Sequence, residues 1–93
     1  MYFVYILYSE KDGGLYVGCT ENISKRLKRH TTGSVPATSN RIPLTCIYTE
    51  IFESKADAYN RERYLKTLWS SNFKKKIKKN YLDNRNIILS KIK

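Results

Sequence analysis

The chain has 93 residues, 41% of them hydrophobic, which suits one folded domain with a modest core and excludes a disordered or multidomain protein. No apolar run reaches the roughly 18 residues of a membrane-spanning helix, so contact with a membrane is not expected. The formal net charge is +10, from 18 Lys and Arg against 8 Asp and Glu. Such a basic balance points to a polyanionic partner, and nucleic acid is the one we expect.

The first residues and the cysteines bear on the compartment and on metal binding. The apolar stretch Met1 to Leu7 is short and lacks a basic leader and a small-residue cleavage site, so a cytoplasmic protein is predicted. Cys19 and Cys46 form no C-x-x-C pair and there is one histidine, so a zinc site is not expected. We expect two free, buried thiols.

A hairpin opens the predicted fold. Tyr2 to Tyr8 is a dense run of Tyr, Phe, Val, Ile and Leu without alternation, which predicts a strand covered on both faces. Glu10 to Gly14 is a turn signal with two glycines, and Leu15 to Thr20 follows as a second short strand. The two strands are therefore expected to pair antiparallel.

A helix, a loop and a third strand come next. Asn22 is a good N-cap for a helix from Ile23 to about His30. The stretch from Thr31 to Pro43 carries a glycine and two prolines and predicts a loop. Leu44 to Glu53, rich in β-branched and aromatic residues, predicts the third strand.

Two further helices complete the chain. Ser54 can cap a helix running to about Trp69, and Ser70 or Ser71 can cap a basic helix to about Asn80. The basic helix would have one apolar stripe, made of Phe73, Ile77 and Tyr81.

The predicted order β-β-α-β-α-α indicates an α+β fold, with a three-stranded antiparallel or mixed sheet flanked by helices. We expect one domain over residues 1–80, with residues 81–93 as a basic tail or a helical extension of it.

Polar side chains occupy helix faces that should be apolar. At about 100° per residue, Arg26 and His30 project toward the core side of the first helix, whereas Lys25, Lys28 and Arg29 project away from it. In the second helix, Ala58, Leu65 and Trp69 form a stripe whose missing member is Glu62. A carboxylate in such a position is paired with a cation, bound to a metal or close to a cleft, and Arg26, Arg61 or Arg63 could pair with it.

Two tyrosines of the hairpin share a face only under one condition. If the loop has four residues, Lys11 to Gly14, period-two alternation places Tyr5 and Tyr16 on the same face, and a loop of three or five would separate them. Gly18 leaves that face open for the close approach of a backbone or ligand.

Five stretches of the chain, taken in order, match the motifs of one known family: Val4-Tyr5-Ile6, Tyr16-Val17-Gly18, Arg26-Leu27 with His30, Arg41-Ile42-Pro43-Leu44, and Arg61-Glu62 with Leu65-Lys66. On these residues the chain resembles the GIY-YIG nucleases, and in particular their small stand-alone branch, which is similar to the nuclease module of bacterial excision repair. Two departures are that Val4 replaces the glycine of the first motif and that neither Asn72 nor Asn80 is assigned to a late asparagine of some members.

The resemblance implies an endonuclease that hydrolyses phosphodiester bonds with one divalent ion, Mg²⁺ or Mn²⁺, held by Glu62. It makes Tyr5 the general base or a partner in activating water, with positive charge from the metal, Arg26 and His30 lowering its pKa. Arg26 would stabilise charge on the phosphate, and Tyr16 and His30 would orient water, phosphate or Tyr5.

The expected substrate is DNA rather than RNA, and DNA repair is the expected process. Two alternatives stay open, a non-catalytic module that binds nucleic acid on the same fold and a structural protein whose basic tail aids solubility. The basic helix would hold the phosphate backbone without reading bases, through Lys74, Lys75, Lys76, Lys78 and Lys79.

Overall fold

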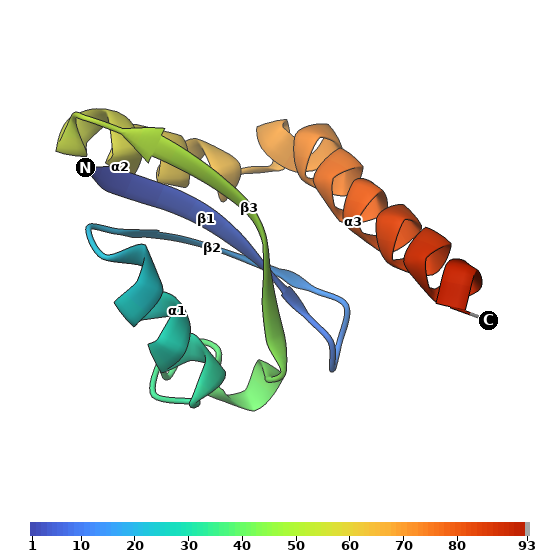
Figure 1. The fold of residues 1–93 in the computed structure, drawn as a ribbon. Coiled ribbons are helices and arrows are strands. Elements are labelled where there is room, and N and C mark those ends of the chain that lie inside the picture. Colours follow the sequence, from blue (N-terminus) through green and yellow to red (C-terminus); the bar gives the residue numbers. More distant parts are fainter. Residues whose placement is uncertain (93) are drawn as a thin grey trace.

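The computed structural model describes the backbone of residues 1–92 and the side chains of residues 1–86, and it shows the expected α+β fold. Three antiparallel strands form one sheet in the order β2-β1-β3 (Figure 1). The strands are β1 (Tyr2–Ser9), β2 (Leu15–Thr20) and β3 (Leu44–Phe52). The helices are α1 (Ile23–Thr31), α2 (Lys55–Leu65) and α3 (Ser71–Ile92), with the short 3-10 helices η1 (Ser39–Arg41) and η2 (Leu68–Ser70) between elements.

The hairpin loop has four residues, so the condition for a shared tyrosine face is met. The Ser9 amide donates to the Gly14 carbonyl at 2.9 Å, which leaves residues 10–13 as the loop, one position earlier than predicted. In this register Tyr5 lies opposite Gly18 and Leu7 lies opposite Tyr16. Directly paired residues point to the same face of a sheet, so Tyr5 and Tyr16 share one.

The sheet is covered on both faces, as the uniform apolarity of β1 predicted. In Figure 1, α1 lies against one face, and α2 with the first part of α3 lies against the other. Ile23 and Leu27 of α1 pack on Tyr5 and Leu7. On the opposite face, the core consists of Val4, Ile6, Val17, Ala58 and Leu65.

The third helix is anchored near its start and beside the hairpin loop. Phe73 and Ile77 pack against the core, as the predicted stripe required. Tyr81 donates to the Glu10 carboxylate at 3.0 Å, and Arg85 pairs with the same carboxylate at 2.6 Å. The helix continues past Asn80, where the sequence had placed its end, because these contacts extend its packed face by more than a turn.

The prediction for the end of the second helix is wrong. α2 ends at Leu65, and Thr67 is extended with ψ of 163°, so the chain turns before η2 begins. The turn rotates Trp69 out of the stripe that held Ala58 and Leu65, and its side chain is 87% exposed instead of buried.

Two further expectations concern the cysteines and membrane-spanning helices. Cys19 and Cys46 are free, but both are only half-buried, since each lies on a strand at an edge of the three-stranded sheet. Within the described part of the chain, no helix is long and apolar enough to cross a membrane.

Candidate active site

Tyr5 lies at the centre of the candidate site. It occupies the middle strand, and its side chain is fully buried on the face that α1 covers. The space for its ring exists because position 18 is glycine: a Cβ atom there would overlap the Tyr5 hydroxyl and ring carbons. The open face expected at Gly18 is therefore filled by the phenol itself.

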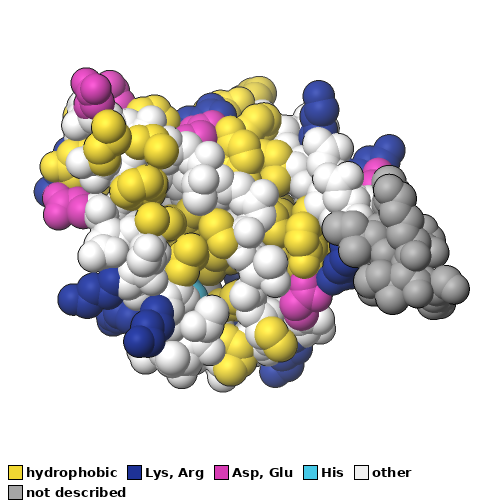
Figure 2. All heavy atoms as spheres, viewed as in Figure 1, with side chains coloured by type: hydrophobic (Ala, Val, Ile, Leu, Met, Phe, Trp, Pro, Cys, Tyr) yellow, Lys and Arg dark blue, Asp and Glu magenta, His cyan; other side chains and the backbone are white. Residues whose placement is uncertain are grey.

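His30 is the direct partner of Tyr5. Its Nε2 atom lies 2.9 Å from the Tyr5 hydroxyl, and its Nδ1 atom lies 2.8 Å from the Thr38 hydroxyl. The side chain is buried, as helix periodicity predicted, and the only histidine of the chain is nearly hidden in Figure 2, where it is cyan. Burial, and then the charges of Arg26 and Arg29, lower the pKa of His30, so the imidazole is neutral at pH 7.

Arg26 completes the hydrogen bonding of the phenol. Its Nε–H donates to the Tyr5 hydroxyl at 3.4 Å. Since Tyr5 accepts from Arg26, its own hydrogen is free to be donated to Nε2 of His30. A neutral imidazole that accepts at Nε2 carries its proton on Nδ1, which then donates to Thr38.

The expected lowering of the Tyr5 pKa is not present in the protein alone, where the pKa is raised instead. Burial is the largest influence and raises the pKa of Tyr5 above its ordinary value, while the hydrogen bond from Arg26 lowers it less. His30 contributes no positive charge, because it is neutral. Tyr5 is therefore protonated at neutral pH, and removing its proton requires an acceptor.

Tyr16 joins the group from β2. Its ring centroid is 5.2 Å from that of His30 and 6.5 Å from that of Tyr5. Four of the five predicted catalytic residues, Tyr5, Tyr16, Arg26 and His30, thus lie together on one face of the sheet.

Glu62, the fifth, approaches from the other side of the sheet. It is on α2, its side chain is 20% exposed, and its carboxylate pairs with Lys66 at 3.2 Å. The expected arginine partners are wrong, because Arg61 pairs with Glu50 at 2.9 Å and Arg63 donates to Asn60. The negative charge of Glu62 raises the pKa of Tyr5, so the two groups are within electrostatic reach of each other.

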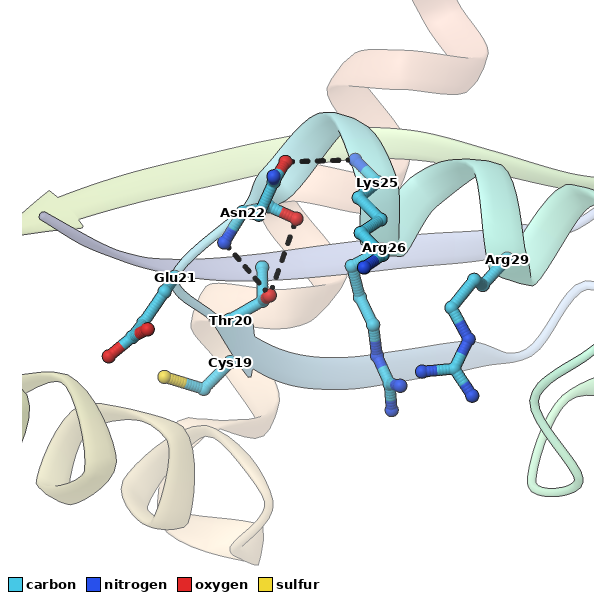
Figure 3. Close-up of a pocket in the computed structure, with 7 residues that line it drawn as sticks. All are labelled: Cys19, Thr20, Glu21, Asn22, Lys25, Arg26 and Arg29. Atoms are coloured by element: carbon cyan, nitrogen blue, oxygen red, sulfur yellow. Dashed lines mark hydrogen bonds between the residues drawn. The ribbon is translucent and has the colours of Figure 1, made fainter.

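A basic cavity lies where β2 meets α1. Its volume is about 360 Å³, and Figure 3 shows the Arg26 and Arg29 side chains extending side by side from α1 toward it. The Asn22 side chain, which caps α1 by accepting from the Lys25 amide at 3.0 Å, also lines the cavity. Lys and Arg side chains gather over α1 on the face seen in Figure 2.

Sequence reasoning missed two contributions to the site. Lys25 and Arg29 are exposed, as predicted, yet both line the basic cavity together with Arg26. The three- and four-residue spacings among α1 cations were a signal for this. Thr38 lies in a loop without periodicity, and no pattern marked it as the partner of His30.

The five lysines of α3 that were predicted to bind phosphate divide into three groups. Lys75, Lys76 and Lys79 are exposed. Lys78 donates to the Gly13 carbonyl at 2.5 Å and so ties α3 to the hairpin loop. Lys74 is half-buried and lines a cavity that also contains Tyr16.

The donor groups fit a single hard cation bound through one carboxylate. Among the residues that the structure describes, no three His, Cys, Asp or Glu side chains are grouped to hold a metal. Mg²⁺ does not require such a cage, because it keeps several waters and is commonly bound through one or two carboxylates and a substrate phosphate. Glu62, partly exposed beside a cavity of about 480 Å³, is a suitable carboxylate.

The three-stranded sheet thus carries a tyrosine–histidine–arginine group beside a basic cavity. The chain belongs to the GIY-YIG family, since the model of the GIY-YIG catalytic domain matches residues 1–80. It is 45% identical over 69 residues to the UPF0213 protein CPE1444 of Clostridium perfringens, covering 73% of each chain.

Two further relatives belong to the same group of proteins. The UPF0213 protein NP_0776A of Natronomonas pharaonis is 38% identical over 68 residues, covering 72% of this chain and 79% of that one. The solution structure of the UPF0213 protein BH0048 of Bacillus halodurans is 32% identical, with a TM-score of 0.49, covering 77% of this chain and 80% of the other.

Proposed function

We propose that the protein is an endonuclease that hydrolyses phosphodiester bonds in DNA with one bound Mg²⁺ or Mn²⁺ ion. The observation that carries the proposal is the Tyr5 hydroxyl, held between Nε2 of His30 at 2.9 Å and Nε of Arg26 at 3.4 Å. Such a group can accept a proton from water while passing its own proton on.

Because its pKa is raised, Tyr5 keeps its proton at neutral pH, and His30 is the group that can accept this proton during the reaction. When Arg26 turns to a bound phosphate and uncovers the buried Tyr5 hydroxyl, an attacking water gives its proton to the Tyr5 oxygen. The hydrogen that Tyr5 already donates then moves to Nε2 of His30. The resulting hydroxide attacks phosphorus, the bond from phosphorus to the 3′ oxygen breaks, and the 3′ oxygen takes a proton from solvent, to which His30 later returns the proton that it received. Thr38 keeps Nε2 available as an acceptor, because its hydroxyl accepts a hydrogen bond from Nδ1–H at 2.8 Å and so holds the proton on Nδ1.

The basic cavity supports phosphate binding next to this group. Arg26 and Arg29 present planar guanidinium groups, which match phosphate oxygens better than an ammonium does. Lys25 adds a third positive charge at the same cavity. Arg26 thus contacts both the Tyr5 hydroxyl and the space where we place the scissile phosphate.

Glu62 would hold the divalent ion, whose chemistry is to stabilise charge on the phosphate and on the leaving 3′ oxygen. In the protein alone, Lys66 neutralises this carboxylate at 3.2 Å. Tyr16, between His30 and the edge of the sheet, would orient water or phosphate. The exposed lysines of α3 would contact the backbone beyond the site.

One observation favours the non-catalytic alternative. The Glu62 carboxylate is already paired with Lys66, and a module that only binds nucleic acid could keep this pair permanently. Dependence of cutting on a divalent ion separates the two functions. A role in DNA repair and a cytoplasmic location remain predictions from the sequence.

The test is a cleavage assay on labelled single-stranded, duplex and branched DNA and RNA, in Mg²⁺, Mn²⁺ or EDTA. We expect cutting of DNA with either ion and none in EDTA. Tyr5→Phe should abolish cutting, while Tyr8→Phe is the matched control, since its hydroxyl has no hydrogen-bond partner among the described residues. Full activity of Tyr5→Phe would reject Tyr5 as the group that takes the proton.

A further inference from the structure

The corner between α2 and α3 presents two large apolar side chains to solvent. Leu68 is 90% exposed and Trp69, the only tryptophan of the chain, is 87% exposed. They lie side by side in η2, the short segment that joins the two helices in Figure 1. Adjacent exposed apolar residues of this size are uncommon on a protein surface and indicate a contact with another molecule.

Hydrogen bonds within the turn fix the backbone on which these two side chains are exposed. The Thr67 hydroxyl donates to the Tyr64 carbonyl at 2.6 Å, and the Ser70 hydroxyl donates to the Thr67 carbonyl at 2.9 Å. Leu65 before the turn and Ser70 after it are buried. The exposed pair is therefore displayed by a turn that is fixed at both ends, so little ordering is needed when a partner binds.

A basic cavity lies between Lys66, at the end of α2, and Tyr16 of the candidate active site. Its volume is about 260 Å³, and it contains Tyr16 together with Lys66 and Lys74. Lys66 ends α2 and Lys74 lies in the first turn of α3, so the exposed pair occupies the connection between the two lysines. Trp69 is three residues from Lys66, which limits the separation of their Cα atoms to roughly 11 Å.

The charges around the corner select the partner. Arg61, whose charge is paired with Glu50, stacks over the Tyr64 ring at 5.4 Å from its centroid. The exposed Arg63 lines the neighbouring cavity together with Tyr59 and Glu62. Aromatic side chains interleaved with cations suit a strand of nucleic acid, whose bases stack on the rings while its phosphates meet the cations. In a duplex the base faces are covered by their neighbours, so an aromatic platform requires unpaired bases.

We propose that this corner is a subsite for a single-stranded segment of the nucleic acid substrate. Trp69 and Leu68 contact unpaired bases. Lys74 binds the phosphate that leads from the corner to Tyr16, and Lys66 joins it when its ion pair with Glu62 opens. The subsite rests on the proposed nuclease function for the identity of its ligand, and it adds a preference for substrates with an unpaired segment next to the cut.

The single tryptophan gives a direct measurement of this contact. Intrinsic fluorescence is followed while oligothymidylate, or a blunt duplex of equal length, is added to the full chain in EDTA, where the proposed enzyme does not cut. We expect quenching that saturates with the single strand, falls with rising salt and is much weaker with the duplex. Equal quenching by both, or none by either, would overturn the subsite.

Variants of Trp69 test the stacking contact. Trp69→Ala should weaken binding of labelled oligothymidylate about tenfold or more, whereas Trp69→Phe should keep most of it. Ile51→Ala, which truncates an apolar residue of β3 that is 61% exposed, is the matched control and should bind as wild type. Unchanged binding by Trp69→Ala would reject the proposal.

Two results distinguish this subsite from the proposed activity and from self-association. Quenching without cutting in Mg²⁺ would reject the nuclease function and leave the subsite standing, and cutting without quenching would do the reverse. A fluorescence change with protein concentration in the absence of DNA would show that a second copy covers the corner, and this would also overturn the proposal.

Discussion

The hydrogen bond between Thr38 and His30 tests whether Thr38 holds His30 in the tautomer and orientation that the proposed mechanism needs. The Thr38 hydroxyl lies 2.8 Å from Nδ1 of His30, and both side chains are buried. Thr38→Val replaces the hydroxyl with a methyl group of nearly the same shape. The substitution leaves Nδ1–H of His30 without an acceptor in a place that water does not reach.

The expected loss of stability follows from that unpaired group. A buried donor left without a partner costs about 1–3 kcal/mol, and the added methyl recovers only part of this. Thr38→Ser keeps the oxygen and loses a methyl group, which costs about 1 kcal/mol. Cutting should fall about 10- to 100-fold in Thr38→Val, as when a group that orients a functional histidine is lost, and Thr38→Ser should restore most of it.

Urea unfolding measures the free energy of unfolding of each variant, and a double-mutant cycle isolates the pair. In a His30→Leu background, Thr38→Val should cost almost nothing, because the donor that it strands is absent. The reasoning is refuted if Thr38→Val is as stable as the wild type, or if its cost is the same with and without His30.

Three further predictions concern the surroundings of the site. Gly18→Ala should destabilise the fold by about 1–3 kcal/mol in urea unfolding, because the new Cβ overlaps the Tyr5 ring, and a normal free energy of unfolding would contradict the tight fit. The lowered pKa of His30 predicts that its contribution to stability is full above its ordinary value of 6.5 and is lost as the pH falls below it, since the unfolded chain then binds a proton that the folded chain does not. Comparing wild type with His30→Gln at about pH 7.5 and about pH 5.5 checks this, and an equal pH dependence would count against it. Glu50→Gln should weaken the fold by about 1–2 kcal/mol, because Glu50 accepts from Arg61 at 2.9 Å and 3.0 Å in a partly buried position, and no change in Tm would show that the pair is solvent-screened.

The elements and the inward faces were predictable because they depend on periodicity. The 3.6-residue repeat placed His30 and Arg26 toward the core, and the parity of a four-residue loop placed Tyr5 and Tyr16 together. Both arguments need only local geometry. The loop itself could shift by one position without changing either conclusion.

The predicted end of α2 was wrong because hydrogen bonds from side chains, which periodicity does not report, stop the helix. No Gly or Pro marks the end of α2, and the helix stops because Thr67 and Ser70 bond to carbonyls of their own turn. Trp69 was therefore assigned to a stripe that does not reach it. The Glu62–Lys66 pair had a sequence signal, the four-residue spacing of opposite charges, but only Arg26, Arg61 and Arg63 were named as possible partners of Glu62.

Glu62→Ala, compared with the wild type for both cutting and binding of one labelled DNA substrate, tests the central claim most directly. We predict that cutting in Mg²⁺ is lost, while binding in EDTA is at least as tight, since the substitution removes a negative charge from a face that meets a polyanion. Cutting by Glu62→Ala at the wild-type rate, or wild-type cutting that persists in EDTA, would contradict a one-metal nuclease built on this carboxylate.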